Sequence, residues 1–174
     1  TVIRVLHSRL ALAKHLSSMV ISISDNSSDD TLAEYLKLNG INYFRGSEKN
    51  VLDRFYKTAT EHEADVIVRI TGDCPLIDPG LVDEMIREFR EHNIDYFSNC
   101  IVPTYPDGLD VEIFTRRALL SAHAESVDVA QREHVKQEAQ LVAQPHAHRP
   151  AGRDARAARP SVQRQLDLEP GRQA

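Results

Sequence analysis

One stretch of the sequence, Asp65 to Asp78, carries the residues best suited to chemistry. Its apolar part, Val66 to Ile70, is short and rich in β-branched residues, which is typical of a strand buried in a parallel sheet. Gly72 then frees the backbone and Pro75 stops the strand, so Asp73 is expected just beyond the carboxyl end. Open α/β sheets bind ligands at that edge, and a carboxylate there suits a hard cation such as Mg²⁺ bridging a nucleotide's phosphates. The alternative is that Asp73 caps a turn through its side chain.

A second acidic group follows a turn later in the chain. Tyr105 to Gly108 has the composition of a turn and leads into an alternating segment, Leu109 to Phe114. The alternation predicts that Asp110 and Glu112 share one face of a strand, about 7 Å apart, because a strand rises about 3.3 Å per residue. Such a pair could grip neighbouring hydroxyls of a sugar or hold a second metal. The alternative is the solvated face of a half-buried strand.

The remaining polar candidates give weaker signals. Arg45 follows a predicted strand and offers a rigid fork of donors for a phosphate or carboxylate, although an arginine in a loop is usually solvated. His134 lies in a predicted helix, where a single histidine is more often structural than catalytic. The sequence has no Ser-His-Asp pattern and no His/Cys cluster with metal-ligand spacing, which argues against nucleophilic hydrolysis and zinc chemistry.

A scaffold for these residues is indicated by strand and helix signals that alternate along the chain. Strands are expected over residues 19–23, 41–44, 66–70, 95–98 and 109–114, and the segments between the first four have helical spacing of apolar residues. Repeated β-α units with short connections predict an α/β fold, a three-layer sandwich with a mostly parallel sheet covered by helices on both faces.

Composition limits the class of protein and its organisation. The 174 residues suffice for one domain, and the net charge of −5 gives no general attraction to nucleic acid or an anionic membrane. Two cysteines and no visible signal peptide or membrane-length apolar run favour the cytoplasm. Gln137 to Ala174 contains no aromatic residue, isoleucine or lysine. We therefore predict an α/β domain over residues 1–136 and a low-complexity, disordered or loosely packed tail over residues 137–174.

Several motifs occur in the order found in one enzyme family. They are Ile23-Ser24-Asp25-Asn26, Tyr43-Phe44-Arg45-Gly46-Ser47-Glu48, Val68-Arg69-Ile70-Thr71-Gly72-Asp73-Cys74-Pro75-Leu76-Ile77-Asp78, Tyr105-Pro106-Asp107-Gly108-Leu109-Asp110-Val111-Glu112 and Arg132-Glu133-His134-Val135. The sequence resembles the spore-coat polysaccharide SpsF-like branch of the cytidylyltransferases, which are relatives of acylneuraminate and KDO cytidylyltransferases. The resemblance covers roughly residues 2–136.

This resemblance implies a GT-A/Rossmann-like fold and an enzyme that transfers CMP from CTP to an acidic sugar for surface polysaccharide synthesis. Mg²⁺ would be the cofactor and pyrophosphate the second product. Asp73 would be the catalytic residue and would hold the metal. The residues implied at the nucleotide are Ser24, Asp25, Arg45, Ser47, Thr71 and Gly72. Those implied at the sugar are Asp107, Asp110, Glu112 and His134.

Two features of the family are missing from this sequence. The family opens with a strand and a glycine-containing basic loop around the triphosphate, and it has a further acidic motif near the end, which Gln165 to Pro170 matches poorly. We therefore expect a fold incomplete at the N-terminus, a polypeptide of low or no activity, and an open strand edge that a second copy could cover in a homodimer. The alternatives are a glycosyltransferase that uses a nucleotide-sugar on the same fold, and a non-catalytic remnant or interaction subunit.

Overall fold

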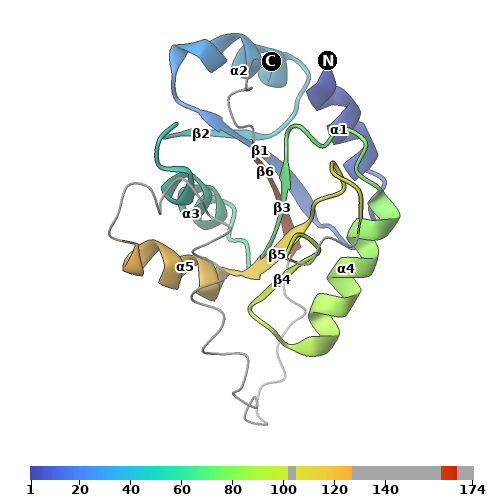
Figure 1. Ribbon diagram of the computed structural model, residues 1–174. Helices are drawn as coiled ribbons and strands as arrows, with labels where there is room; N and C mark the ends of the chain where they lie inside the picture. The colour runs from blue at the N-terminus through green and yellow to red at the C-terminus, as the bar shows by residue number, and fades with distance from the viewer. Residues whose placement is uncertain (102–104, 127–161, 168–174) are drawn as a thin grey trace.

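The computed structural model describes residues 1–101, 105–126 and 162–167, and within them the chain forms a six-stranded sheet (Figure 1). The strand order is β2-β1-β6-β3-β5-β4. The strands are β1 (Ser18–Ser24), β2 (Tyr43–Gly46), β3 (Val66–Thr71), β4 (Tyr96–Ser98), β5 (Glu112–Thr115) and β6 (Val162–Asp167). β5 runs antiparallel to both β3 and β4, and the other pairings are parallel. The predicted mostly parallel sheet is confirmed.

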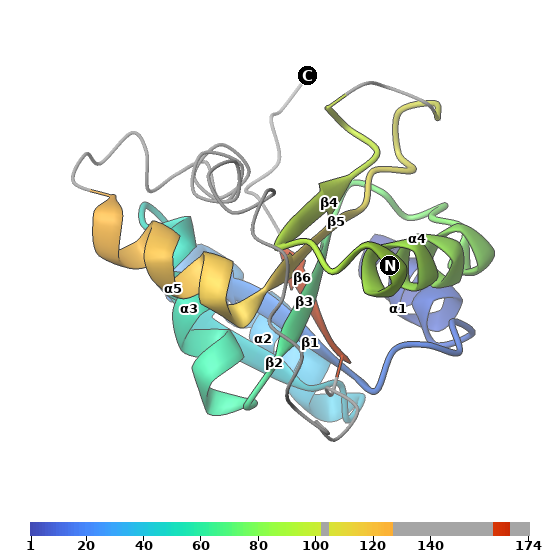
Figure 2. The ribbon, with the colours of Figure 1, turned by 90° about the horizontal axis from the view of Figure 1, so that it is seen from below.

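Helices cover both faces of this sheet. They are α1 (Val2–Leu10), the short 3-10 helix η1 (Ser27–Asp29), α2 (Asp30–Leu38), α3 (Val51–Glu61), α4 (Pro79–His92) and α5 (Arg116–Glu125). Figure 2 shows α1 and α4 on one side of the sheet and α3 and α5 on the other. Residues of α1, α2 and α4 share one apolar core with β1 and β3, while α3 and α5 build a second core on Ile67 and Phe114. The three-layer α/β architecture predicted from the sequence is therefore present.

Helix α4, which follows the Asp73 segment, is determined by local sequence. The Asp78 carboxylate caps its start by accepting from the backbone N–H groups of Gly80 at 2.6 Å and Leu81 at 3.1 Å, and Pro79 occupies the first turn. Asn93 ends the helix in the left-handed conformation, with φ 48°. The helical spacing expected for this segment is present, and its apolar residues are buried: Leu81, Val82, Met85, Ile86 and Phe89. The cap and these buried residues together fix where the chain leaves the sheet edge.

Strand β6 comes from the segment for which the sequence predicts no stable core. It lies between β1 and β3, in parallel register with both, so that Leu166 pairs with Ile21 on one side and with Ile70 on the other. Residues 162–167 thus fill an interior position of the sheet, and the outer strands among the described residues are β2 and β4. The rest of the predicted tail, residues 137–161 and 168–174, lies outside the described residues.

A search of the described residues for membrane-spanning elements finds no helix with the length and apolar character to cross a bilayer.

A charged cluster joins α3 to α5. Its contribution to the free energy of unfolding is expected to depend on pH in the acid range. The Asp53 carboxylate lies 2.7 Å from the Lys57 Nζ and 3.1 Å from the His123 Nε2, and the His123 ring stacks on Tyr56. Burial alone would raise the pKa of Asp53, but the hydrogen bonds and charges of Lys57 and His123 lower it below the ordinary 3.8. A lowered folded-state pKa contributes stability above about pH 4, and this contribution is lost as the pH falls through that pKa.

We expect the free energy of unfolding to fall as the pH drops below about 4, and the Asp53→Asn variant to lack part of that fall. Urea unfolding of both proteins between about pH 3 and 6 measures it. The same pH dependence in parent and variant would mean that Asp53 contributes nothing to it.

Candidate active site

Asp73 stands at the carboxyl edge of the sheet, two residues after β3 ends at Thr71. A cavity of about 400 Å³ opens there, lined by Thr71, Asp73, Cys74, Asp107, Gly108 and Asp110. Four of the residues predicted at the site from sequence, Thr71, Asp73, Asp107 and Asp110, are therefore brought together. Gly72 lies between two of them in the turn after β3.

A tight, well-anchored turn presents Asp73. The Cys74 N–H donates to the Thr71 carbonyl at 3.2 Å, and the Arg9 guanidinium of α1 holds the Ile77 carbonyl at 2.9 Å. The Asp73 side chain is exposed to the cavity, and its Oδ1 accepts the Cys74 thiol at 3.6 Å, a long contact typical of sulfur. No other hydrogen bond reaches this carboxylate from the described residues. The carboxylate oxygens thus remain available to a ligand.

The thiol beside Asp73 stays protonated. Burial raises the pKa of Cys74, and the nearby Asp73 charge adds to the increase, while the Thr71 hydroxyl and the Asp110 backbone amide oppose it. The Thr71 Oγ1 and Cys74 Sγ lie 3.2 Å apart. Cys74 is therefore a neutral donor that orients the Asp73 carboxylate rather than a nucleophile.

The donor set around the cavity fits Mg²⁺. Asp73, Asp107 and Asp110 supply carboxylates and Thr71 a hydroxyl, all of them hard oxygen donors. The described residues contain no group of three or more His, Cys, Asp or Glu side chains already arranged around one metal position. Magnesium usually takes only one or two carboxylates and completes its shell with substrate phosphates and water, so a site with Asp73 as the principal ligand would suit it.

Glu112 is not brought to this cavity. It pairs directly with Arg69 across β3 and β5, forms a buried ion pair with that guanidinium, and accepts the Tyr96 hydroxyl at 2.8 Å. The Glu112 side chain is 4% exposed and the Arg69 side chain 11%. The Arg69 guanidinium also lies over the Phe55 ring of α3, 5.7 Å from its centroid. Glu112 thus sits deeper in the sheet than Asp110, with its oxygens bound by the protein.

The predicted nucleotide residues at the carboxyl ends of β1 and β2 form a separate, cross-linked group at the same sheet edge. Arg45 donates to the carbonyls of Ser24 at 3.2 Å and Asn26 at 2.9 Å, and pairs with Asp30 at 2.7 Å. These contacts hold the loop after β1 in place and occupy the guanidinium. Asp25 is exposed at this edge.

Ser47 has a local role that the sequence does not reveal. Its Oγ accepts the Asn50 N–H at 3.0 Å, which closes the turn before α3, and its carbonyl accepts the buried Arg54 at 2.8 Å. β6 separates β1 from β3, so the Ser24, Arg45 and Ser47 group and the Asp73 cavity lie on either side of it. His134 lies outside the described residues.

Two residues that line the cavity were not among the predicted site residues, Cys74 and Gly108. Cys74 is adjacent to Asp73, but a cysteine alone gives no sequence signal for an orienting role. Gly108 has φ 88°, a conformation that other residues rarely adopt, and it turns the chain between Asp107 and Asp110. The Pro-Asp-Gly turn composition was the signal for this residue.

Comparison with known proteins places this chain in a family. A family model described as cytidylyltransferase matches residues 1–162. An uncharacterized protein of Methanocaldococcus jannaschii is 39% identical over 136 residues, which are 77% of this chain and 54% of that protein. The spore coat polysaccharide biosynthesis protein SpsF of Bacillus subtilis is 34% identical over 123 residues, 70% of this chain and 50% of SpsF. The chain thus spans about half the length of these relatives.

Solved structures agree in fold. A cytidylyltransferase from Leptospira borgpetersenii superposes with a TM-score of 0.76 at 27% identity, covering 99% of this chain and 66% of that one. A CMP:2-keto-3-deoxy-manno-octonic acid synthetase complexed with CTP has a TM-score of 0.59 at 13% identity, covering 96% of this chain and 79% of that one, and shows the fold alone. With a family model that matches most of its length and an SpsF relative at 34% identity, the chain belongs to the cytidylyltransferase family, in its SpsF-like branch.

Proposed function

We propose that the protein transfers CMP from CTP to an acidic sugar, with release of pyrophosphate, in the synthesis of a surface polysaccharide. The observation that carries this proposal is the exposed Asp73 at the carboxyl end of β3, in one cavity with Asp107 and Asp110. Family membership supports the use of CTP. The relative named for spore coat polysaccharide biosynthesis supports the polysaccharide.

The chemistry requires positioning and charge neutralisation more than covalent help. The sugar hydroxyl attacks the α-phosphorus of CTP, the new oxygen–phosphorus bond forms, and the bond to pyrophosphate breaks in line with it. Asp73 would hold Mg²⁺, which when bound neutralises negative charge on the phosphates. Asp107 and Asp110 accept hydrogen bonds from sugar hydroxyls and orient the attacking one. Ser24 at the end of β1 and Ser47 just after β2 border the nucleotide.

We also propose that this polypeptide by itself binds CTP weakly and reacts slowly. The described residues that line the cavity include acids but no lysine or arginine. The Arg45 guanidinium is occupied by Ser24, Asn26 and Asp30, and Arg69 is paired with Glu112. A triphosphate in this cavity needs cations and backbone N–H donors from elsewhere.

A version extended to the length of the relatives is expected to exceed this polypeptide in kcat/KM for CTP by tenfold or more, since about 1.4 kcal/mol of lost stabilisation costs tenfold. Pyrophosphate release measured with CTP, Mg²⁺ and an acidic sugar compares the two. Equal rates would show that this polypeptide suffices to bind the triphosphate, and the proposal of weak binding would be wrong.

Product analysis of the extended version tests the proposed function against its rivals. We expect pyrophosphate and a CMP-sugar from CTP and one member of a panel of acidic sugars. A glycosyltransferase would instead release a nucleoside phosphate from a nucleotide-sugar and leave CTP intact. A folded, extended protein that is inactive in both assays would be a non-catalytic subunit, and the proposed function would be wrong.

A further inference from the structure

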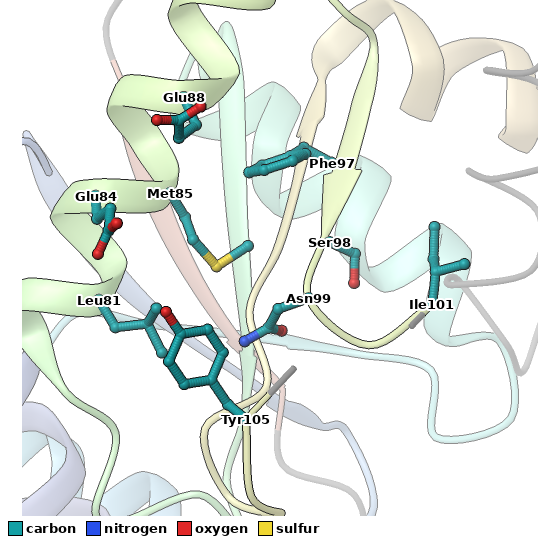
Figure 3. Close-up of a pocket in the computed structure, with 9 residues that line it drawn as sticks. All are labelled: Leu81, Glu84, Met85, Glu88, Phe97, Ser98, Asn99, Ile101 and Tyr105. Carbon is teal, nitrogen blue, oxygen red and sulfur yellow. The ribbon is translucent and has the colours of Figure 1, made fainter. Parts of the chain in front are cut away.

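Asn99, the residue after β4, binds the chain on both sides of Asp110. Its Nδ2 donates to the Leu109 carbonyl at 2.8 Å, and its Oδ1 accepts the Val111 N–H at 2.9 Å. The residue is only 9% exposed. Figure 3 shows Asn99 in the wall of a groove between α4 and β4, between Ser98 and Tyr105. Both the nitrogen and the oxygen of the carboxamide thus bind the backbone of residues 109–111, the segment that carries Asp110 into the cavity.

The Asn99 carboxamide continues the hydrogen bonding between β4 and β5 beyond their last paired residues. The last pairing of β4 with β5 joins Ser98 to Glu112, and the next backbone contact, from the Asn99 N–H to the Val111 carbonyl, is a long 3.4 Å. A carboxamide carries one acceptor and a donor group, like a peptide unit, so the Asn99 side chain extends the pairing by one step. Asp110 lies between two residues held in this way.

Asp73, on the other side of the cavity, is held by a separate turn. The Cys74 N–H donates to the Thr71 carbonyl at 3.2 Å, and the Cys74 sulfur contacts the Asp73 carboxylate at 3.6 Å. The separation of Asp73 from Asp110 therefore depends on two anchors, the Cys74 turn and the Asn99 carboxamide. Removing the Asn99 carboxamide frees the Leu109 carbonyl and the Val111 N–H, while the Cys74 turn is unchanged.

We propose that Asn99 is a positioning residue for the acceptor sugar, which holds Asp110 in the cavity and touches neither substrate. The inference rests on the proposed function of that cavity. A displacement of about 1 Å at a reacting centre can cost on the order of 100-fold in rate, so the loss of this anchor has a measurable effect on acceptor use. The nucleotide contacts are made by other elements and are unaffected.

A double-mutant cycle of Asn99→Leu and Asp110→Ala tests the coupling, with Asn42→Leu, an exposed asparagine, as the matched control. In the extended protein, Asn99→Leu is expected to raise KM for the sugar about tenfold and to change KM for CTP less than about twofold. In the Asp110→Ala background, Asn99→Leu is expected to cause no further rise in KM for the sugar. Additive effects of the two substitutions, or an equal rise in both KM values, would overturn the proposal.

Amide hydrogen exchange separates this proposal from the proposed function. Asn99→Leu is expected to speed exchange of the residue 109–111 amides about tenfold and to leave β3 and α4 unchanged. Asn99→Asp keeps the acceptor for Val111 and serves if the leucine variant does not fold. Absence of CMP transfer in the parent would refute the proposed function, whereas unchanged exchange in both variants would refute the role of Asn99.

Discussion

The Asp73→Asn variant is expected to lose about 100-fold or more in the rate of CMP transfer, because removing a metal ligand removes charge stabilisation from the transition state. Stability should hardly change, since the only described protein contact of this carboxylate is the long one from the Cys74 thiol. Measurement of kcat and of the unfolding midpoint on the extended protein separates the two effects.

Glu84→Gln is the matched control for Asp73→Asn. Glu84 is an exposed acid on α4 outside the cavity, and its replacement should leave the rate within about twofold of the parent. Near-normal, Mg²⁺-dependent turnover by Asp73→Asn would remove Asp73 from the mechanism. A fall in both variants would point to a general effect of net charge on CTP binding.

Glu112→Ala is expected to lower the free energy of unfolding by about 3–5 kcal/mol, because it leaves the Arg69 guanidinium buried without its carboxylate. Both side chains are at least 89% buried, being 4% and 11% exposed, so solvent screens the pair little. The variant also removes the hydrogen bond that the Tyr96 hydroxyl donates to Glu112. Urea unfolding at neutral pH measures the loss.

Two further sets of substitutions are needed to interpret the stability of Glu112→Ala. Replacing both partners, Arg69→Met with Glu112→Leu, should recover much of the stability, because neither charge of this pair is left buried without the other. Arg117→Ala removes an ion pair whose arginine side chain is 73% exposed, and its buried partner Asp95 keeps the Thr115 hydroxyl as a donor, so the loss should be smaller than that of Glu112→Ala. If Glu112→Ala were as stable as the parent but failed to use the sugar, Glu112 would act on the substrate and the structural role would be wrong.

The elements that position Asp73 were predictable because their signals are local. The β-branched run of β3, the glycine and proline after it, and the apolar face of α4 each lie within one segment of sequence. Glu112 shows the limit of such patterns. Alternation predicts a face of the strand, but the partner on that face, Arg69, follows from the antiparallel register of β3 and β5. The residues of that pair are 43 positions apart.

Strand β6 was missed for a related reason. Val162 to Asp167 contains only two apolar residues, and the composition of the surrounding tail favours no core. Its place is set by backbone pairing with β1 on one side and β3 on the other. The paired residues are more than 90 positions apart in the sequence. Composition describes side chains and carries no information on such a ladder. The same applies to Asn99, which is recognisable only once β4 and β5 are paired.

Paramagnetic broadening of amide NMR signals by Mn²⁺, a substitute for Mg²⁺, in the presence of CTP tests most directly that the chemistry is centred on Asp73. It detects weak binding and needs no turnover. We predict that broadening begins at residues 71–74 and 107–110 and disappears in Asp73→Asn, with the Glu84→Gln variant behaving as the parent. Broadening centred on another part of the fold, or unchanged in Asp73→Asn, would contradict the account.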